Sequence, residues 1–167
     1  DFGDAGRKRT MQLLDSLGIE TAGLEIKPIA EFVRDSIKYG FIAFAPNKGT
    51  LNLIDTKAAA RMVKALADSN DIVIVSFHGG AEGKDFQHLP KGPEEFYGEN
   101  RGNLYEFAHQ MIDAGADIIF GHGPHVTRAM EIYKGRFIAY SLGNFSTYGR
   151  FNLSGPNGLA PLVQLVT

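Results

Sequence analysis

The chain has 167 residues, of which 44% are hydrophobic and 22% charged, and its formal net charge at pH 7 is −2. These are the values of an ordinary globular domain, and they provide no basic face or stripe of the kind that binds nucleic acid. Because the chain has no cysteine, disulfides, thiolate-bound zinc and cysteine nucleophiles are excluded. No apolar run approaches the roughly 18 residues that a membrane-spanning helix requires.

The first third of the chain predicts a helix followed by β structure. Apolar residues recur at helical spacing over residues 5–17, and Gly18 follows, a residue type that accepts the positive φ common just after a helix. A short strand is expected over residues 19–24. The β-branched and aromatic run within residues 32–46 predicts a strand or a hairpin. In the predicted helix over residues 5–17, the residues that share one face are Thr10, Leu13, Leu14 and Leu17.

The middle of the chain predicts a helix, a buried strand and a long connection. A helix over residues 56–69 is followed by residues 71–77, whose nearly continuous apolar character is typical of a parallel strand covered on both faces. The polar segment 79–102 is too long for an ordinary connection, and segments of that length are usually functional or mobile. The helix would bury Ala59, Met62, Val63 and Leu66.

The last third predicts a capped helix, a strand and a hairpin. A helix over residues 104–114 has Asn103 as its N-cap and Glu106 three residues later, the pattern of a capping box. A short buried strand over residues 117–120 comes next. Residues 129–142 then predict a hairpin with the two-residue turn Lys134-Gly135. We find no internal repeat or linker, so the chain is expected to form one domain.

Three histidines follow the two buried strands. His78 comes directly after the first strand, and His122 and His125 come directly after the second. Because the carboxyl ends of parallel strands meet at one edge of a sheet, the three imidazoles are expected to converge there. Neutral imidazole is the commonest protein ligand of transition metals, although a single histidine at a strand end is more often structural. From the residues alone, metal binding and a structural role are about equally supported.

The motifs around these histidines resemble those of the CapA-type family of poly-γ-glutamate capsule biosynthesis. Residues 76–82, Ser-Phe-His-Gly-Gly-Ala-Glu, are similar to its His-x-Gly-x-Glu segment. Residues 112–126 resemble its Gly-His-x-Pro-His signature, and residues 138–145 its Tyr-Ser-Leu-Gly-Asn-Phe strand. The resemblance covers nearly the whole chain. Gly79 departs from the family pattern, which has an aromatic residue there, and this change would alter the wall of the pocket.

The resemblance implies a four-layer α/β/β/α sandwich of the calcineurin-like metallophosphoesterase type. It also implies that His78, His122 and His125 are ligands of a divalent transition metal, Mn, Fe or Zn. The Gly-Asp and Asn-His motifs of the family would precede Asp1. We therefore expect residues 1–167 to be the C-terminal portion of a larger domain, without its N-terminal strands and with part of a two-metal site. An exposed strand edge would then pair with the preceding segment or with another chain.

Three further residues are candidates for contacts to an anionic polymer or a phosphoester. Glu82 would orient a histidine or bind substrate, or else be a solvated loop acid. Asn144 would line the site, or else satisfy backbone groups at a strand end. Arg101 offers two parallel hydrogen bonds to a carboxylate or phosphate, although a surface position is the better interpretation from sequence. His109, on the third predicted helix, has no assigned function.

Three functions remain open at this point. The first is a metal-dependent hydrolase of phosphoesters, in which a metal-bound hydroxide is the nucleophile. The second is a role in making, exporting or anchoring a capsule polymer, which the family name implies together with a place in the bacterial cell envelope. The third is a binding module whose metal site has decayed, because fold alone does not fix function.

Overall fold

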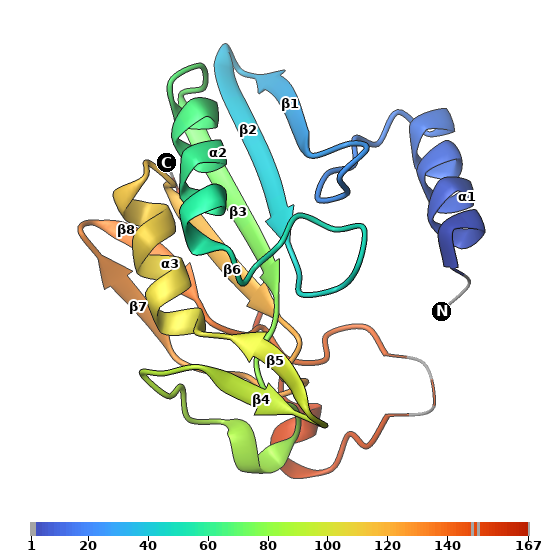
Figure 1. Cartoon of the computed structure of the whole chain (residues 1–167), viewed down its shortest axis with the longest axis vertical. Helices are drawn as coiled ribbons and strands as arrows, with labels where there is room; N and C mark the ends of the chain where they lie inside the picture. Colours follow the sequence, from blue (N-terminus) through green and yellow to red (C-terminus); the bar gives the residue numbers. More distant parts are fainter. Residues whose placement is uncertain (1–2, 148, 150, 167) are drawn as a thin grey trace.

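The computed structural model describes residues 3–147, 149 and 151–166, and its centre is one mixed sheet of six strands in the order β1-β2-β3-β6-β8-β7. The central strands β2, β3, β6 and β8 run parallel, whereas β1 and β7 pair antiparallel at the two edges (Figure 1). The strands of this sheet are β1 (Ile29–Arg34), β2 (Ile37–Phe44), β3 (Ile72–His78), β6 (Ile118–His122), β7 (Met130–Tyr133) and β8 (Arg136–Ala139).

Three α-helices and a small second sheet complete the described fold. Strands β4 and β5 pair antiparallel within the long polar segment, which also contains the 3₁₀ turn η1. None of the described helices has the length and apolar character needed to cross a membrane. The bounds are α1 (Gly3–Ser16), α2 (Thr56–Ala67), η1 (Lys84–Phe86), β4 (Glu94–Phe96), β5 (Glu99–Gly102), α3 (Leu104–Asp113) and η2 (Gly155–Gly158).

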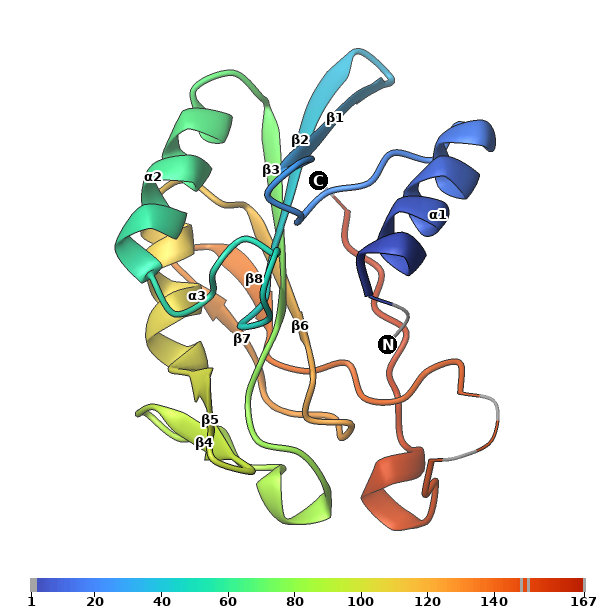
Figure 2. The ribbon, with the colours of Figure 1, turned by 45° about the vertical axis from the view of Figure 1, so that its right-hand side comes forward.

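Helices α2 and α3 cover one face of the sheet, and α1 and the C-terminal segment lie on the other side (Figure 2). Side chains alternate along the strands, so Val73, Val75 and Phe77 of β3 point into the core beneath the helices. The helices contribute Val63, Leu66, Phe107 and Met111 among others to the same apolar cluster. Burial of these large side chains provides the main driving force for the fold.

Both core helices begin at a residue whose side chain satisfies a free backbone N–H. Asp55 Oδ1 accepts a hydrogen bond from the Ala58 N–H at 2.9 Å, and Asn103 Oδ1 accepts one from the Glu106 N–H at 3.2 Å. The Asn103 amide also donates to Glu106 Oε2 at 3.0 Å. The predicted capping interaction at α3 is therefore confirmed, with Glu106 contacting the cap through its side chain as well as its backbone.

The other face of the sheet is apolar but only half-buried. Ile74, Ile118 and Phe120 line a groove of about 580 Å³ beneath C-terminal residues Pro161–Val163. The prediction that β3 would be covered on both faces is thus only partly correct. Because a parallel sheet in a sandwich buries both faces, this is the face on which a four-layer fold would place its second sheet.

The structure confirms the α/β class, because a multi-strand sheet is flanked by helices. The hairpin predicted over residues 129–142 is confirmed as β7–β8, and of the two alternatives for residues 32–46, a strand or a hairpin, the structure has the hairpin β1–β2. The strand expected over residues 19–24 is wrong: the pairings described there are isolated bridges from Leu24 to Lys27 and Thr50. Gly23 has a φ of 96°, which turns the chain away from an extended path.

Candidate functional site

The two strands that precede the histidines end side by side. In the parallel pairing of β3 with β6, His78 is the register partner of His122. Both side chains line a hollow of about 210 Å³, together with Ala43, Ala45 and Thr50. The predicted convergence of these two histidines is therefore confirmed. We refer to this end of the sheet, with the loops that follow β3 and β6, as the histidine rim.

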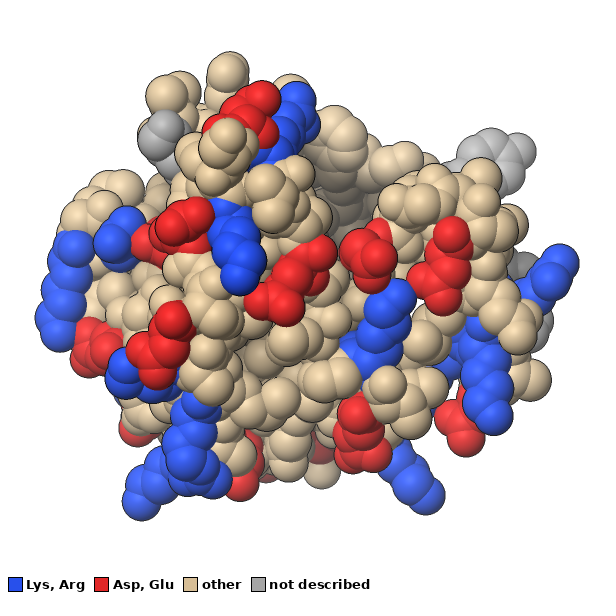
Figure 3. Space-filling model, turned by 90° about the horizontal axis from the view of Figure 1, so that it is seen from above, with Lys and Arg blue, Asp and Glu red and all other residues tan. Residues whose placement is uncertain are grey.

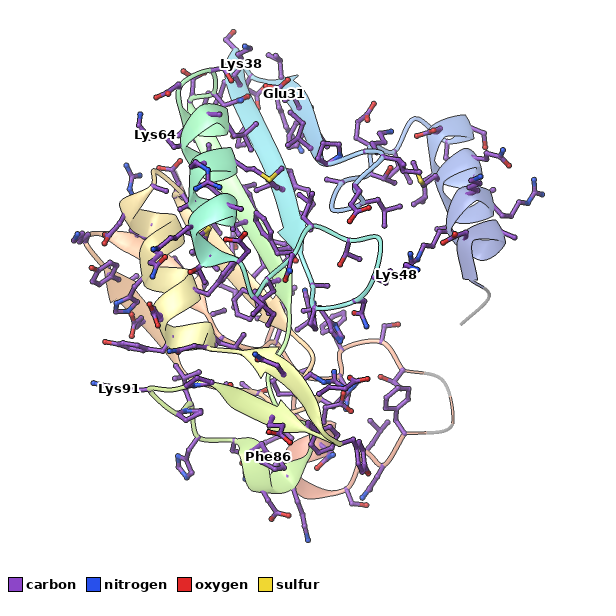
Figure 4. The ribbon with its side chains drawn as sticks, in the orientation of Figure 1. Glu31, Lys38, Lys48, Lys64, Phe86 and Lys91 are labelled. Carbon is purple, nitrogen blue, oxygen red and sulfur yellow. The ribbon has the colours of Figure 1, made fainter. Side chains whose placement is uncertain are left out.

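The histidine rim lies at the end of the molecule that carries η1, where Phe86 is labelled, and Glu31 and Lys38 mark the opposite end (Figure 4). Over that opposite end, basic and acidic side chains are interspersed (Figure 3). The Lys38 N–H there donates a hydrogen bond to Asp71 Oδ2 at 2.8 Å, which ties the start of β2 to the start of β3. A polar contact thus joins β2 and β3 at the end of the sheet where both strands begin, and His78 and His122 lie at the end where β3 and β6 finish.

Backbone hydrogen bonds join the loops of the histidine rim. The Gly79 N–H donates to His122 O at 2.9 Å, and the Gly83 N–H donates to Pro124 O at 2.8 Å. The Gly80 N–H donates to Arg101 O at 2.9 Å, which brings the far end of the long segment to the rim. Because each bond crosses between segments far apart in sequence, the loops hold one another in place.

Gly79 is a packing requirement in this chain. A Cβ atom there would lie 2.5 Å from Leu53 Cδ2 and 2.8 Å from the carbonyl oxygen of Arg101. The aromatic side chain that the family resemblance led us to expect at this position therefore has no space here. Because Gly79 has no side chain, Leu53 and Leu104 pack closely against the loop that follows β3, at the position where we expected a change in the pocket wall.

His125 reaches the rim from a strained backbone. Its φ is 57°, a left-handed conformation that is uncommon for residues other than glycine. Its Nδ1 lies 3.0 Å from Asn144 Oδ1, and its Nε2 lies 3.7 Å from Glu82 Oε2. Asn144 also donates to the backbone carbonyl of His125 at 2.9 Å. Asn144 and Glu82 therefore contact opposite nitrogens of one imidazole.

Glu82 and Arg101 form the charged part of the rim. Arg101 Nη1 lies 3.3 Å from Glu82 Oε1, and Arg101 Nη2 lies 3.0 Å from Glu99 Oε2. The guanidinium also lies over the ring of Phe96, 5.9 Å from its centroid. With 12% of its side-chain surface exposed, Arg101 is largely buried, contrary to the surface position favoured from sequence.

The protein environment keeps the two strand-end histidines neutral. The pKa of His78 is lowered by desolvation, and by electrostatic interaction with His125 and Arg101, while Glu82 opposes the shift. The pKa of His122 is lowered by desolvation and by His78. Because unperturbed histidine titrates near 6.5, both rings have free lone pairs at neutral pH.

A complete metal centre is not formed by the part of the chain that the structure describes. Across residues 3–147, 149 and 151–166, no group of three or more His, Cys, Asp or Glu side chains is placed to hold a metal ion. His78 and His122 offer two neutral imidazoles, whereas a catalytic zinc site commonly has three protein ligands. The described residues therefore supply at most part of the ligand set of a metal site.

A buried ion pair that sequence patterns do not indicate lies behind the rim. Arg128 donates to both oxygens of Glu94 at 2.8 Å, to Phe86 O at 2.7 Å and to Ala81 O at 3.1 Å. Glu94 in turn accepts from the Ala81 N–H at 3.0 Å. The side chains of Arg128 and Glu94 are 0% and 4% exposed. Neither residue stands out in sequence, because charged residues of polar segments are ordinarily solvated.

Comparison with known proteins places these motifs in a family. The model of the family described as bacterial capsule synthesis protein PGA_cap matches residues 1–148. PGA biosynthesis protein CapA of Bacillus subtilis (strain 168) is 32% identical over 142 residues, which are 85% of this chain and 31% of that protein. Capsule biosynthesis protein CapA of Bacillus anthracis is 29% identical over 164 residues, 87% of this chain and 37% of that protein.

The chain spans about a third of the length of these curated relatives. Among solved structures, a hypothetical protein from Thermus thermophilus is similar with a TM-score of 0.46 and 16% sequence identity, over 70% of this chain and 39% of that one. The family match includes both histidine motifs and the loop after β8 that carries Asn144. The chain belongs to the bacterial capsule synthesis family PGA_cap.

Proposed function

We propose that the histidine rim is one wall of a metal-dependent, phosphoesterase-like site in a protein of capsule polymer synthesis. The observation that carries the proposal is the pairing of His78 with His122 at the ends of adjacent parallel strands, both in neutral form. A bound divalent metal would polarise a phosphoryl oxygen or a water molecule. His78 and His122 would hold it, with His125 as the third histidine, and further ligands would come from outside the described residues.

The chemistry of Arg101 favours an anionic substrate, either a phosphoester or a carboxylate-bearing polymer. Its Nε is buried and has no hydrogen-bond partner among the residues that the structure describes. Its Nη2 is paired with Glu99, whose side chain is largely exposed and thus easily displaced. A phosphate or carboxylate that replaced Glu99 would receive two parallel hydrogen bonds from the guanidinium. Glu82 would stay in place and keep Arg101 oriented.

Metal binding by the purified chain tests the proposal. We expect weak binding of Zn²⁺ or Mn²⁺ in calorimetric titrations, because the described residues alone offer few ligands. Replacing His122 with Ala removes one of the paired imidazoles and should weaken the affinity by at least about tenfold, roughly 1.4 kcal/mol. His88→Ala is the matched control, since His88 is exposed and lines a separate hollow with Asp85 and Glu95.

A non-catalytic role in handling the polymer is the second candidate. A relative in Mycobacterium tuberculosis (strain CDC 1551 / Oshkosh), 37% identical over 83 residues, is named a probable polyglutamine synthesis accessory protein. The accessory role would be favoured if the chain bound neither Zn²⁺ nor Mn²⁺. It would also be favoured if His122→Ala bound the metal as tightly as the wild-type chain. Binding of poly-γ-glutamate that is lost in Arg101→Ala but kept in His122→Ala would support it directly.

A further inference from the structure

The side-chain amide of Asn144 has one orientation that its neighbours permit. Its Nδ2 lies 2.9 Å from the carbonyl oxygen of His125 and 3.1 Å from that of Asn157. Carbonyl oxygens only accept hydrogen bonds, so the atom that faces both of them must be the NH₂ group. The amide oxygen of Asn144 consequently faces the imidazole of His125.

This orientation decides which nitrogen of His125 carries the proton. An amide oxygen has no hydrogen to donate, so the 3.0 Å contact between Asn144 Oδ1 and His125 Nδ1 is a hydrogen bond only if Nδ1 is protonated. In the neutral ring the lone pair is then on Nε2. Nε2 points toward Glu82, at 3.7 Å from Oε2, which is beyond hydrogen-bonding distance.

Without Asn144 the other tautomer would be favoured. The Glu82 carboxylate would accept a hydrogen bond from a protonated Nε2, and small movements of either side chain would close the 3.7 Å gap. Asn144 opposes this by accepting from Nδ1 and by holding the backbone of His125 at its positive φ through the carbonyl. It therefore constrains both the ring and the main chain of the same residue.

We propose that Asn144 is a positioning residue, which fixes His125 in the Nδ1-protonated tautomer and thereby presents the Nε2 lone pair at the histidine rim. The assignment of Asn144 to substrate binding from sequence is replaced by this role, because both of its polar atoms already have protein partners. The proposal rests on hydrogen bonds alone and holds whether or not the rim binds a metal.

The tautomer can be measured by long-range ¹H–¹⁵N correlation of the histidine rings in the 167-residue chain, without added metal. The spectrum would be recorded near pH 8, above the ordinary histidine range near 6.5. His125→Gln identifies the signals of His125 among the five histidines. We expect Nδ1 of His125 to be protonated and Nε2 to be unprotonated. A wild-type spectrum with a protonated Nε2 would overturn the proposal.

Two variants separate tautomer control from general packing. Asn144→Leu removes the acceptor and should shift His125 to the Nε2-protonated form. Asn144→Asp keeps an acceptor for Nδ1 and should retain the original tautomer, even if the loss of its donor lowers stability. An unchanged tautomer in folded Asn144→Leu contradicts the proposal.

Thr127→Val provides the matched control. Thr127 Oγ1 donates to Leu159 O at 2.8 Å, so it joins the same loop to the C-terminal segment but makes no hydrogen bond to His125. The variant should leave the His125 tautomer unchanged. A tautomer shift in Thr127→Val would show that loop packing, rather than the Asn144 acceptor, determines the state of the ring.

Discussion

At the scale of single residues, the lowered pKa values of His78 and His122 make folding stability depend on pH. The unfolded chain takes up protons on these residues near pH 6.5, whereas the folded chain does so only at lower pH. In that window the unfolded state binds more protons, so the free energy of unfolding rises with pH. The stabilisation is fully present above about pH 6.5 and is lost as the pH falls through the folded-state values.

Urea unfolding at a series of pH values checks this prediction. We expect the midpoint to decrease on acidification below the ordinary histidine range. The double variant His78→Asn/His122→Asn should flatten the dependence across that range. An equally steep slope in the double variant would assign the effect to other groups.

The positions of His78 and His122 could be predicted from sequence, because strand order alone brings their Cα atoms together. The partners of His125 could not be predicted, since Glu82 and Asn144 approach through loops whose paths depend on long-range packing. The burial of Arg101 was unforeseen for the same reason. Sequence patterns thus predict which strand-end residues lie close together, whereas the hydrogen bonds and ion pairs of the loop residues depend on how the loops fold.

At the scale of elements, local rules predicted the helices and hairpins well. Asn103 and the apolar spacing identified α3, and Lys134-Gly135 identified the β7–β8 turn, because capping and turn chemistry act within a few residues. The small sheet β4–β5 was not predicted, since its strands are short and polar. Their position depends on the buried pair of Arg128 and Glu94, an interaction across 34 residues.

Removing one partner of that pair should destabilise the fold strongly. Arg128→Met leaves the Glu94 carboxylate buried without its cation, and we expect a loss of about 3–5 kcal/mol in the free energy of unfolding. Replacing both partners by Arg128→Met and Glu94→Leu should cost less than Arg128→Met alone, because no buried charge is then unpaired. Denaturant titrations of the wild-type chain and of these two variants measure the differences.

The exposed pair of Arg7 and Asp4 provides the comparison. Their side chains are 38% and 86% exposed, so Arg7→Ala should change stability by no more than about 1 kcal/mol. A small effect of Arg128→Met, similar to that of Arg7→Ala, would mean that the long segment is held by other contacts.

At the scale of the whole molecule, the α/β class and the strand order around β3 and β6 followed from apolar patterning. The limited burial of α1 did not: its apolar spacing predicted a helix with one apolar face, and α1 has no buried residue. Leu13 and Leu17 are 54% and 64% exposed. Periodicity shows that a helix has an apolar face, and it cannot show what covers that face.

This arrangement of α1 predicts two levels of protection against hydrogen exchange. Opening α1 exposes little apolar surface, so its amides should exchange with deuterium by local unfolding. Amides of β3 and β6, such as those of Val75 and Ile119, should exchange only through global unfolding. Mass spectrometry of peptides from each region distinguishes the two, and equal protection of α1 and β3 would contradict the prediction.

The same difference governs how the chain would respond to proteases. Lys27 connects the end of α1 to the body through Asp15 at 2.9 Å and Glu20 at 3.2 Å, and both contacts are at the surface. Limited digestion should therefore cut first between α1 and β1, and Lys27→Ala should accelerate that cut. The fragment that survives would begin near β1 and would retain the histidine rim, because every residue of the rim lies C-terminal to the cleavage region.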